Sequence, residues 1–312
     1  MAAQTKASNV PKVTIGMCIK NSGVMVRKAL DSILCQDYSL SSMELVVVDG
    51  NSQDRTIDIL KGRMTNTELK VKIFSENSGL ATARQMVVDK AVGDYVVWVD
   101  ADMILSRSYV LRQVAFMDGH PEVGIAAGKY SVHMGQGMAA DLENIVYAVD
   151  SAFGEIGASK FGYLPGTEGS IFRIKAIRQI GGFDVSMDGA AEDTEVAYRM
   201  IFKGWKIAIT QEMFAESTRA SWLSLWRQYM WYGRGGHFIF HKDCNMISLL
   251  KMTPMAGFYA GVIRCPKAYL LVHKRFVFFL PFHYAYKRVA WFIGFITAHS
   301  GGYGHSDKVK KI

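Results

Sequence analysis

The sequence contains few cysteines, and they are not spaced for a metal site. Its 312 residues include Cys18, Cys35, Cys244 and Cys265, with no C-x-x-C pair. A disulfide framework or a zinc ribbon would require such pairs. We therefore expect reduced thiols in a cytosolic protein.

Two phosphate-binding motifs are also missing. The first apolar segment, 13–19, is followed by Lys20-Asn21-Ser22-Gly23 and not by the G-x-G-x-x-G turn of a dinucleotide-binding fold. The chain also contains no G-x-x-x-x-G-K-[ST] motif. These absences argue against an NAD-type dehydrogenase and against a P-loop ATPase.

Long uninterrupted apolar runs are absent as well. A membrane-spanning helix needs about 20 apolar residues in succession. Segment 247–263 contains Lys251, segment 269–282 contains Lys274 and Arg275, and segment 289–298 is short. Residues 1–12 are small and polar, so we expect no secretory signal.

Positive charge is concentrated toward the C-terminus. The formal charge is +8, yet residues 220–312 contain 13 Lys or Arg and only two Asp, a net of +11, which leaves −3 on residues 1–219. This basic part is also rich in aromatic residues. Nucleic acid and an anionic membrane surface both suit such a surface. Apolar runs such as 276–282 favour the membrane, and we expect no nucleic-acid partner.

The C-terminal segments are therefore predicted to lie in the membrane interface. Amphipathic helices or a shallow re-entrant hairpin fit their length and charge, with Tyr284, Tyr286 and Trp291 as anchors at the surface. Full spanning is one alternative, and a soluble enzyme that dimerises through these helices is another. The scattered histidines are expected at the surface or interface, since only His237 and His241 have helical i, i+4 spacing.

Apolar segments of strand length alternate with amphipathic helical segments over the first part of the chain. Strands are predicted at 13–19, 44–48, 71–74, 95–99 and 123–132, and helices at 24–35, 54–64, 80–91 and 139–153. This alternation is typical of an α/β domain with a mostly parallel sheet and helices on both faces. Ligands bind such sheets at the carboxyl ends of the strands.

Two acids follow the strand predicted at 95–99. Asp100 and Asp102 are two residues apart, so an extended chain points both carboxylates to one side. Carboxylates at the end of a buried strand are costly to desolvate unless a cation lies against them. They indicate a divalent metal site, although a solvated turn would explain this pair alone. Asn21, Asp49 and Asn51 also fall at strand ends.

A second pair of acids begins the helix predicted near residue 191. Glu192 and Asp193 lie in its first turn, where the helix dipole stabilises ionised carboxylates, although ordinary capping would also place acids there. Upstream, segment 163–173 is punctuated by glycines that suggest close approach of the backbone to a ligand, or a plain turn.

Taken together and in this order, the motifs over residues 13–236 resemble the family-2 inverting glycosyltransferases of the GT-A fold. The similarity is to the membrane-attached kind related to cellulose synthases and dolichyl-phosphate sugar synthases. Asp100-Ala101-Asp102 resembles the metal-binding D-x-D, and Ala191-Glu192-Asp193 the T-E-D helix whose last acid is the catalytic base. The resemblance implies these nucleotide-binding residues: Ile19, Lys20, Asn21, Asp49, Asn51, Asn77, Gly79, Arg84 and Asp100.

The same resemblance implies the remaining roles. Asp100 and Asp102 would bind Mg²⁺ or Mn²⁺, Asp193 would be the base, and Glu192 and Arg234 would support it. The implied acceptor or sugar contacts are Gly166, Thr167, Glu168, Gln228 and Trp231, with Trp205 and Tyr163 as further stacking candidates.

The match is partial where cellulose synthases have Q-x-x-R-W. In Gln228-Tyr229-Met230-Trp231-Tyr232, Trp231 stands at the arginine position and Tyr232 at the tryptophan position, with Arg234 as a substitute cation. This departure disfavours a processive polymerase. Gly50 and Gln85 also replace frequent family residues, so the nucleobase is left open.

The predicted function is metal-dependent transfer of a hexose, with mannose slightly favoured, from a GDP- or UDP-sugar to a lipid-linked acceptor. Polyprenyl or dolichyl phosphate, or a glycan built on its diphosphate, would suit a membrane-associated enzyme on the cytoplasmic face. A processive polysaccharide synthase and a catalytically silent nucleotide-sugar-binding scaffold are the alternatives. The predicted parts are a flexible 1–12, a catalytic domain 13–236, membrane-associated helices 237–300 and a basic tail 301–312.

Overall fold

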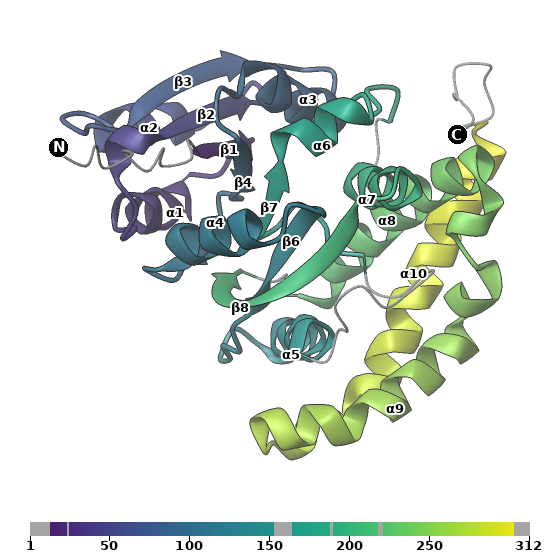
Figure 1. The fold of residues 1–312 in the computed structure, drawn as a ribbon. Helices are drawn as coiled ribbons and strands as arrows, with labels where there is room; N and C mark the ends of the chain where they lie inside the picture. The colour runs from purple at the N-terminus through teal and green to yellow at the C-terminus, as the bar shows by residue number, and fades with distance from the viewer. Residues whose placement is uncertain (1–12, 24, 153–163, 188–189, 218–220, 303–312) are drawn as a thin grey trace, which may run out of the picture.

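The computed structural model describes residues 13–23, 25–152, 164–187, 190–217 and 221–302. These residues form one eight-stranded sheet, with helices on its faces and three long helices at the C-terminal end (Figure 1). The predicted α/β fold with a mostly parallel sheet is confirmed. The predicted N-terminal segment 1–12 and most of the tail 301–312 lie outside the described residues.

The N-terminal half of the sheet is parallel, in the order β3-β2-β1-β4. Its strands are β1 (Val13–Ile19), β2 (Met43–Asp49), β3 (Lys70–Ser75) and β4 (Tyr95–Trp98). Its helices are α1 (Met25–Leu34), α2 (Thr56–Arg63) and α3 (Leu80–Lys90). All seven were predicted within a few residues, because the strands contain short apolar runs, the helices bury spaced positions and the boundaries are polar.

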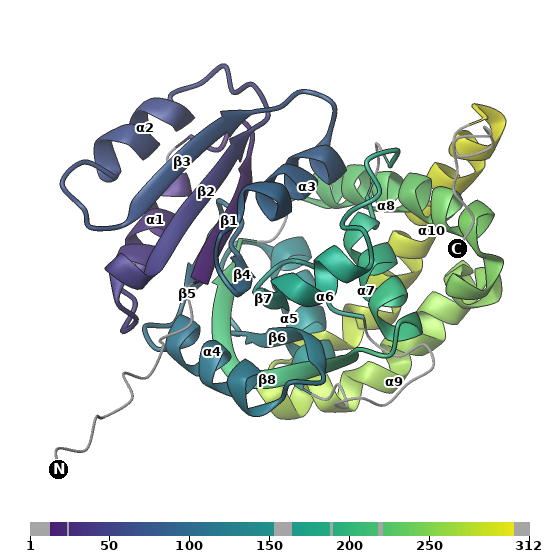
Figure 2. The ribbon, with the colours of Figure 1, turned by 45° about the horizontal axis from the view of Figure 1, so that its top comes forward.

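Both faces of β1, β2 and β4 are buried, which explains the nearly continuous apolar runs of these three strands. Leu45 and Val47 pack with α1 and α2, whereas Val46 and Val48 pack with α3. Alternate residues of a strand point to opposite faces, so a strand covered on both sides is apolar throughout. Figure 2 shows α1 and α2 on one side of the sheet and α3 on the other.

The second half of the sheet is mixed, in the order β4-β7-β6-β8-β5. Its strands are β5 (Met103–Leu105), β6 (Val123–Tyr130), β7 (Ser170–Arg173) and β8 (Lys206–Glu216). β7 runs antiparallel to β4 and β6, and β5 antiparallel to β8. The flanking helices are α4 (Tyr109–Gly119), α5 (Met138–Ala152), α6 (Ile174–Gln179) and α7 (Glu192–Phe202).

Three long helices follow β8: α8 (Trp222–Lys242), α9 (Pro254–Val272) and α10 (Leu280–Ser300). The described residues also form four short 3₁₀ helices: η1 (Leu40–Ser42), η2 (Cys244–Met246), η3 (Leu249–Met252) and η4 (Arg275–Phe279). The boundary predicted between residues 236 and 237 falls inside α8, and that division of the chain stays a prediction.

Helices α8 and α10 pack closely because glycines lie where they cross. A Cβ on Gly233 would overlap the main chain of Trp291, and one on Gly294 would overlap that of Met230. α8 itself begins with a capping box, in which the Ser221 hydroxyl accepts from the Ser224 N–H. The result is a tight helical pair joined directly to the sheet domain.

Two of the predicted surface anchors are wrong. Trp291 and Tyr284 are only 4% and 5% exposed, because the Trp291 ring packs on Gly236 of α8 and the Tyr284 ring packs with residues of α5 and α9. The Tyr286 hydroxyl donates to the Trp222 carbonyl at 2.8 Å. Across the described helices, none combines the length and the apolar character needed to cross a membrane. All four cysteines are free thiols, as predicted.

Candidate active site

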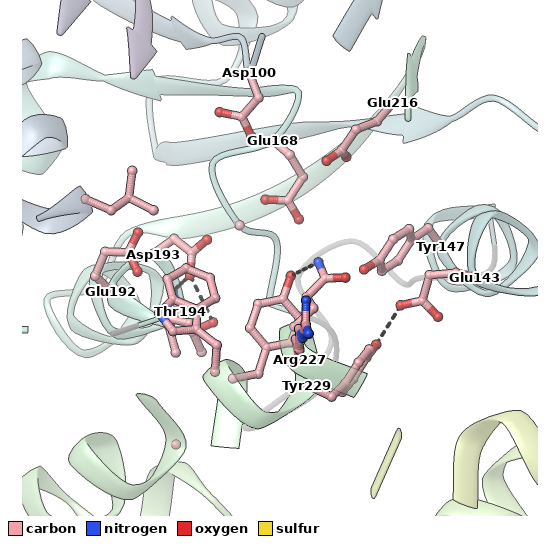
Figure 3. Close-up of a pocket in the computed structure, with 18 of the residues that line it drawn as sticks. Asp100, Glu143, Tyr147, Glu168, Glu192, Asp193, Thr194, Glu216, Arg227 and Tyr229 are labelled. Carbon is pink, nitrogen blue, oxygen red and sulfur yellow. Dashed lines mark hydrogen bonds between the residues drawn. The ribbon is translucent and has the colours of Figure 1, made fainter. Parts of the chain in front are cut away.

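A cavity of about 1070 Å³ opens at the carboxyl ends of β1 and β4. Helices α7, α8 and α10 supply its other walls. Figure 3 shows Asp100, Glu168 and Glu216 on one side of it, Asp193 on α7, and Arg227 and Tyr229 on α8. The structure thus brings together these predicted site residues: Lys20, Asn21, Arg84, Asp100, Asp102, Gly166, Glu168, Glu192, Asp193, Gln228 and Trp231.

Three carboxylates form the sheet side of the cavity. Asp100 follows β4, Asp102 precedes β5, and Glu216 ends β8 opposite Met103 in the β5–β8 ladder. The Ser217 N–H donates to the Asp102 carbonyl at 3.2 Å, which fixes the end of β8 beside the D-x-D. Sequence reasoning missed Glu216 because it missed β8, whose buried and exposed residues alternate at many positions.

The electrostatics of these acids fit a cation. Burial raises the pKa of Asp100, and burial together with the Glu168, Asp102 and Asp100 charges raises that of Glu216 well above its ordinary value. Desolvated carboxylates facing one another repel unless a positive ion lies between them. Oxygen ligands of this kind suit Mg²⁺ or Mn²⁺, so the residues fit the predicted metal.

The second acidic group begins α7. Ala191 caps the helix in a left-handed conformation, φ 75°, and directs the first turn toward the cavity. Asp193 Oδ1 accepts from the Thr194 N–H at 2.6 Å, and its Oδ2 lies 3.6 Å from Arg84 Nη1. Arg84 also forms a buried ion pair with Glu192. Arg84, predicted as a nucleotide contact, therefore binds the acids of α7.

Burial is the main influence on the pKa of the Glu192 carboxyl. Removal from water raises its pKa to about 7, a rise that the Arg84 guanidinium partly offsets. Burial alone would lower the pKa of Arg84, but the Glu192 and Asp193 carboxylates outweigh it and keep the guanidinium charged. Arg84 thus contacts both acids of the first turn of α7.

Glu168 lies against Asp193 across Gly166. A Cβ on Gly166 would clash with the Glu168 carboxylate and would lie 2.7 Å from Asp193 Oδ2. Burial, and then the charge of Asp193, raise the pKa of Glu168 to about 8. Both causes favour the protonated form of the Glu168 carboxyl.

Several predicted nucleotide contacts hold the strand ends together instead of lining the cavity. Asp49 accepts from the N–H and hydroxyl of Ser52 at 3.0 and 2.6 Å. The same hydroxyl accepts from the Asn21 N–H at 2.9 Å, which ties the ends of β1 and β2. The residues away from the cavity lining are Ile19, Asp49, Asn51, Asn77, Gly79 and Thr167.

Helix α8 lines the opposite wall with its first turns. Gln228 Nε2 donates to the Tyr232 hydroxyl at 2.8 Å, and Trp231 faces the cavity while 39% exposed. Arg227 lines the cavity and Arg234 does not, so Arg227 is the cation placed where the sequence suggested Arg234.

The other two stacking candidates lie elsewhere. Trp205 donates to Gln179 at 2.9 Å and packs beside Gly124, away from the cavity lining. Tyr163 lies outside the described residues.

A buried ionic group joins this wall to α5 and α10. Glu143 accepts from Tyr229, His283 and Lys287, each at 2.7 Å. Burial would raise the pKa of Glu143, but the Lys287 charge and the bond from His283 outweigh burial and lower it. Sequence reasoning missed this group because Lys287 and His283 lie about 140 residues from Glu143.

Comparison with known families agrees with this site. The model of "Glycosyl transferase family group 2" matches residues 95–299, and that of "Glycosyl transferase family 2" matches residues 14–160. The chain belongs to glycosyltransferase family 2.

Two relatives illustrate the breadth of the family. The chain is 22% identical over 256 residues to the poly-beta-1,6-N-acetyl-D-glucosamine synthase of Staphylococcus aureus (strain COL). It is 26% identical over 255 residues to the probable glycosyltransferase YdaM of Bacillus subtilis (strain 168). Both matches take in 78% of this chain but only 59% of the relative's length.

Solved structures show the GT-A fold. The mannosyltransferase PcManGT from Pyrobaculum calidifontis, in complex with GDP-Man and Mn²⁺, matches 96% of this chain and 77% of its own with a TM-score of 0.58 at 19% identity. S. aureus TarS 1-349, in complex with UDP, matches 93% of this chain and 92% of its own with a TM-score of 0.53 at 16% identity.

Proposed function

We propose that this glycosyltransferase transfers mannose from GDP-mannose to a lipid-linked acceptor at a membrane surface, with inversion at the anomeric carbon. The observation that carries the proposal is the single cavity that holds Asp100, Asp102 and Glu216 on one side and Asp193 on another. The similar fold of PcManGT, which binds GDP-Man and Mn²⁺, supports this donor and metal.

Asp100, Asp102 and Glu216 would hold Mg²⁺ or Mn²⁺ at the sheet side. When bound, the ion stabilises the negative charge that grows on the leaving diphosphate. Lys20, in the loop after β1, adds positive charge at the same end of the cavity.

Asp193 would act as general base toward an acceptor hydroxyl. Its carboxylate takes the hydroxyl proton while the acceptor oxygen forms a bond to the anomeric carbon and the bond to the diphosphate breaks. Arg84 holds this carboxylate in place, and Gly166 leaves room beside it. General-base catalysis of this kind contributes roughly 10²- to 10⁴-fold in rate.

The exposed surface of α9 supports a membrane-bound acceptor. α9 buries its small residues Gly257, Gly261 and Ala268 and exposes its large apolar ones. The exposed large apolar residues of α9 and η4 are Met255, Phe258, Tyr259, Val262, Ile263, Tyr269, Leu270, Leu271, Phe278 and Phe279. An apolar face of this extent beside basic residues suits the interface of an anionic membrane, here the cytoplasmic face.

Replacing the base tests the proposal. We expect Asp193→Asn to lower kcat by about 10²-fold or more, since an amide cannot accept the proton. Binding of GDP-mannose with Mn²⁺ should stay within about threefold, because the carboxylates at the sheet side are unchanged. The assay measures the formation of mannosylated acceptor from GDP-mannose and a polyprenyl-phosphate glycan. The matched control is Asp58→Asn, which changes an exposed residue of α2. Wild-type turnover by Asp193→Asn would exclude this residue as the base.

A second candidate is a processive synthase that uses UDP-N-acetylglucosamine. The poly-N-acetylglucosamine synthase relatives favour it. Thermal shifts with GDP- and UDP-sugars, each with Mn²⁺ and with chelator, would identify the donor. Product length then separates the candidates, because single transfer gives one added sugar and processive synthesis gives a ladder.

A further inference from the structure

Three histidines meet where the far end of α8 packs on α10. His237 and His241 are one turn apart on α8, and His299 comes from the last turn of α10. His237 Nε2 lies 3.1 Å from His299 Nδ1 and 3.0 Å from His241 Nε2. The sequence spacing revealed only the α8 pair, because the third histidine is 62 residues away from His237.

The arrangement suits a metal ion better than a set of hydrogen bonds. A neutral imidazole nitrogen has a single lone pair or a single N–H, so His237 Nε2 cannot bond well to two rings at once. A cation among the rings would take one lone pair from each of them. One ring nitrogen from each histidine lies within 4.8 Å of the others. In a tetrahedral zinc site with Zn–N bonds of about 2.0–2.1 Å, two ligand nitrogens lie about 3.3–3.4 Å apart. Small side-chain movements would therefore bring the three histidine nitrogens to this spacing.

The surroundings define the class of metal. His237 is buried, His241 is partly buried and His299 is exposed, which leaves one side of the group open to solvent. The Phe295 ring lies 4.9 Å from the His237 ring, and the Phe240 ring 5.8 Å from that of His241. Three imidazoles in a partly apolar setting select zinc or a similar transition metal, whereas Mg²⁺ prefers oxygen ligands.

We propose that His237, His241 and His299 form a transition-metal site, with zinc as the ion and a solvent molecule as fourth ligand. The site is separate from the carboxylate group in the cavity. It joins α8 to α10, and the neighbouring Gly236, Ile239 and Trp291 line the cavity. Zinc bound there would hold α8 against α10, and both helices line the cavity.

Calorimetric titration of the full chain with Zn²⁺ tests the site. Excess Mg²⁺ is present throughout to occupy the carboxylates without competing for imidazole. We expect one strongly bound Zn²⁺ per wild-type chain, and a rise in Tm of about 3–5 °C at a hundredfold excess over Kd. His241→Gln and His299→Gln should each lose this binding, whereas His273→Asn, which removes an exposed histidine outside the group, should retain it.

Cobalt provides a readout that does not depend on the folding of the variants. Co²⁺ in a four-coordinate nitrogen site gives intense visible absorption bands, and wild-type protein should develop them at one equivalent. Equal Zn²⁺ binding by wild type, His241→Gln and His299→Gln would overturn the proposal. So would wild-type protein that binds Co²⁺ only in a six-coordinate form with weak bands.

Discussion

At the scale of single residues, the carboxyl groups of the cavity differ because of their neighbours. Glu168 faces Asp193 across Gly166, and burial together with the Asp193 charge raises its pKa to about 8, although Arg84 acts in the opposite direction. Glu143 faces Lys287 and His283, and its pKa falls. Burial opposes ionisation in both, so the nearby charges decide which group is ionised.

The raised pKa of Glu168 predicts a loss of stability with rising pH. Its folded-state value of about 8 exceeds the ordinary 4.5, so between these values the folded chain holds a proton that the unfolded chain has released. The contribution of this group is present in full below about pH 4.5 and is lost as pH rises through about 8.

Glu168→Gln should remove that loss, since glutamine does not ionise. We expect equal Tm values for variant and wild type near about pH 5 and a higher Tm for the variant near about pH 8, measured in chelator. A difference in Tm between wild type and variant that stays constant with pH would show that Glu168 ionises freely in the folded protein.

The sequence predicted those site residues whose signal is local. Asp100 and Asp102 follow a buried strand, and Asp193 starts a helix, so each is visible within a few positions. Glu216 reaches the same cavity only through the pairing of β8 with β5, and Glu143 meets its partners only through packing of α5 on α10. Contacts between distant segments leave no periodic pattern to read.

At the scale of secondary-structure elements, α5, α8 and α10 are joined by the Glu143 group. Tyr229 comes from α8, and His283 and Lys287 from α10. The Lys287 ammonium also lies 4.9 Å from the centre of the Tyr229 ring. Removing the Lys287 charge would leave the Glu143 carboxylate buried with Tyr229 and His283 but without the ammonium that balances it, which costs far more than removing both charges.

Lys287→Met should therefore destabilise the protein by about 3–5 kcal/mol, as measured by urea unfolding. The double variant Glu143→Gln/Lys287→Met should recover most of that loss, because no charge remains buried at this position. Lys274→Met, an exposed lysine after α9, serves as the control and should change stability little. Equal losses in the single and double variants would mean that the pair itself supplies no coupling.

Elements were predictable where burial is continuous and not where it alternates or is brief. β1, β2 and β4 are buried along almost their whole length and were found, and the edge strand β3 was found from its short apolar segment 71–74. β5 has three residues, and β8 exposes Gln211 and Met213 between buried neighbours. α4 was missed even though Tyr109, Val114 and Met117 bury one of its faces.

At the scale of the whole molecule, helix α9 lies at the outer edge of the C-terminal helices (Figure 1), and its large apolar residues are exposed. Substituting Met255, Tyr259 and Ile263 together by serine should weaken sedimentation with vesicles of phosphatidylcholine and phosphatidylglycerol by about tenfold or more. These residues are exposed, so the far-UV circular dichroism spectrum should not change.

The control for this prediction is Phe202→Ser on α7, which removes an equally exposed aromatic ring from another surface. It should leave vesicle binding as it is. Unchanged binding by the triple variant would place the membrane contact outside α9.

The glycines between the C-terminal helices have a consequence for acceptor choice. Gly261 of α9 contacts the main chain of Pro281, and Gly233 that of Trp291, so these helices have no space in which to slide past one another. We therefore expect the apolar face of α9 to keep a fixed distance from the cavity. On our proposal, the height of Asp193 above the lipid head groups is constant, and the enzyme would select acceptors by how far their reacting hydroxyl extends from the membrane.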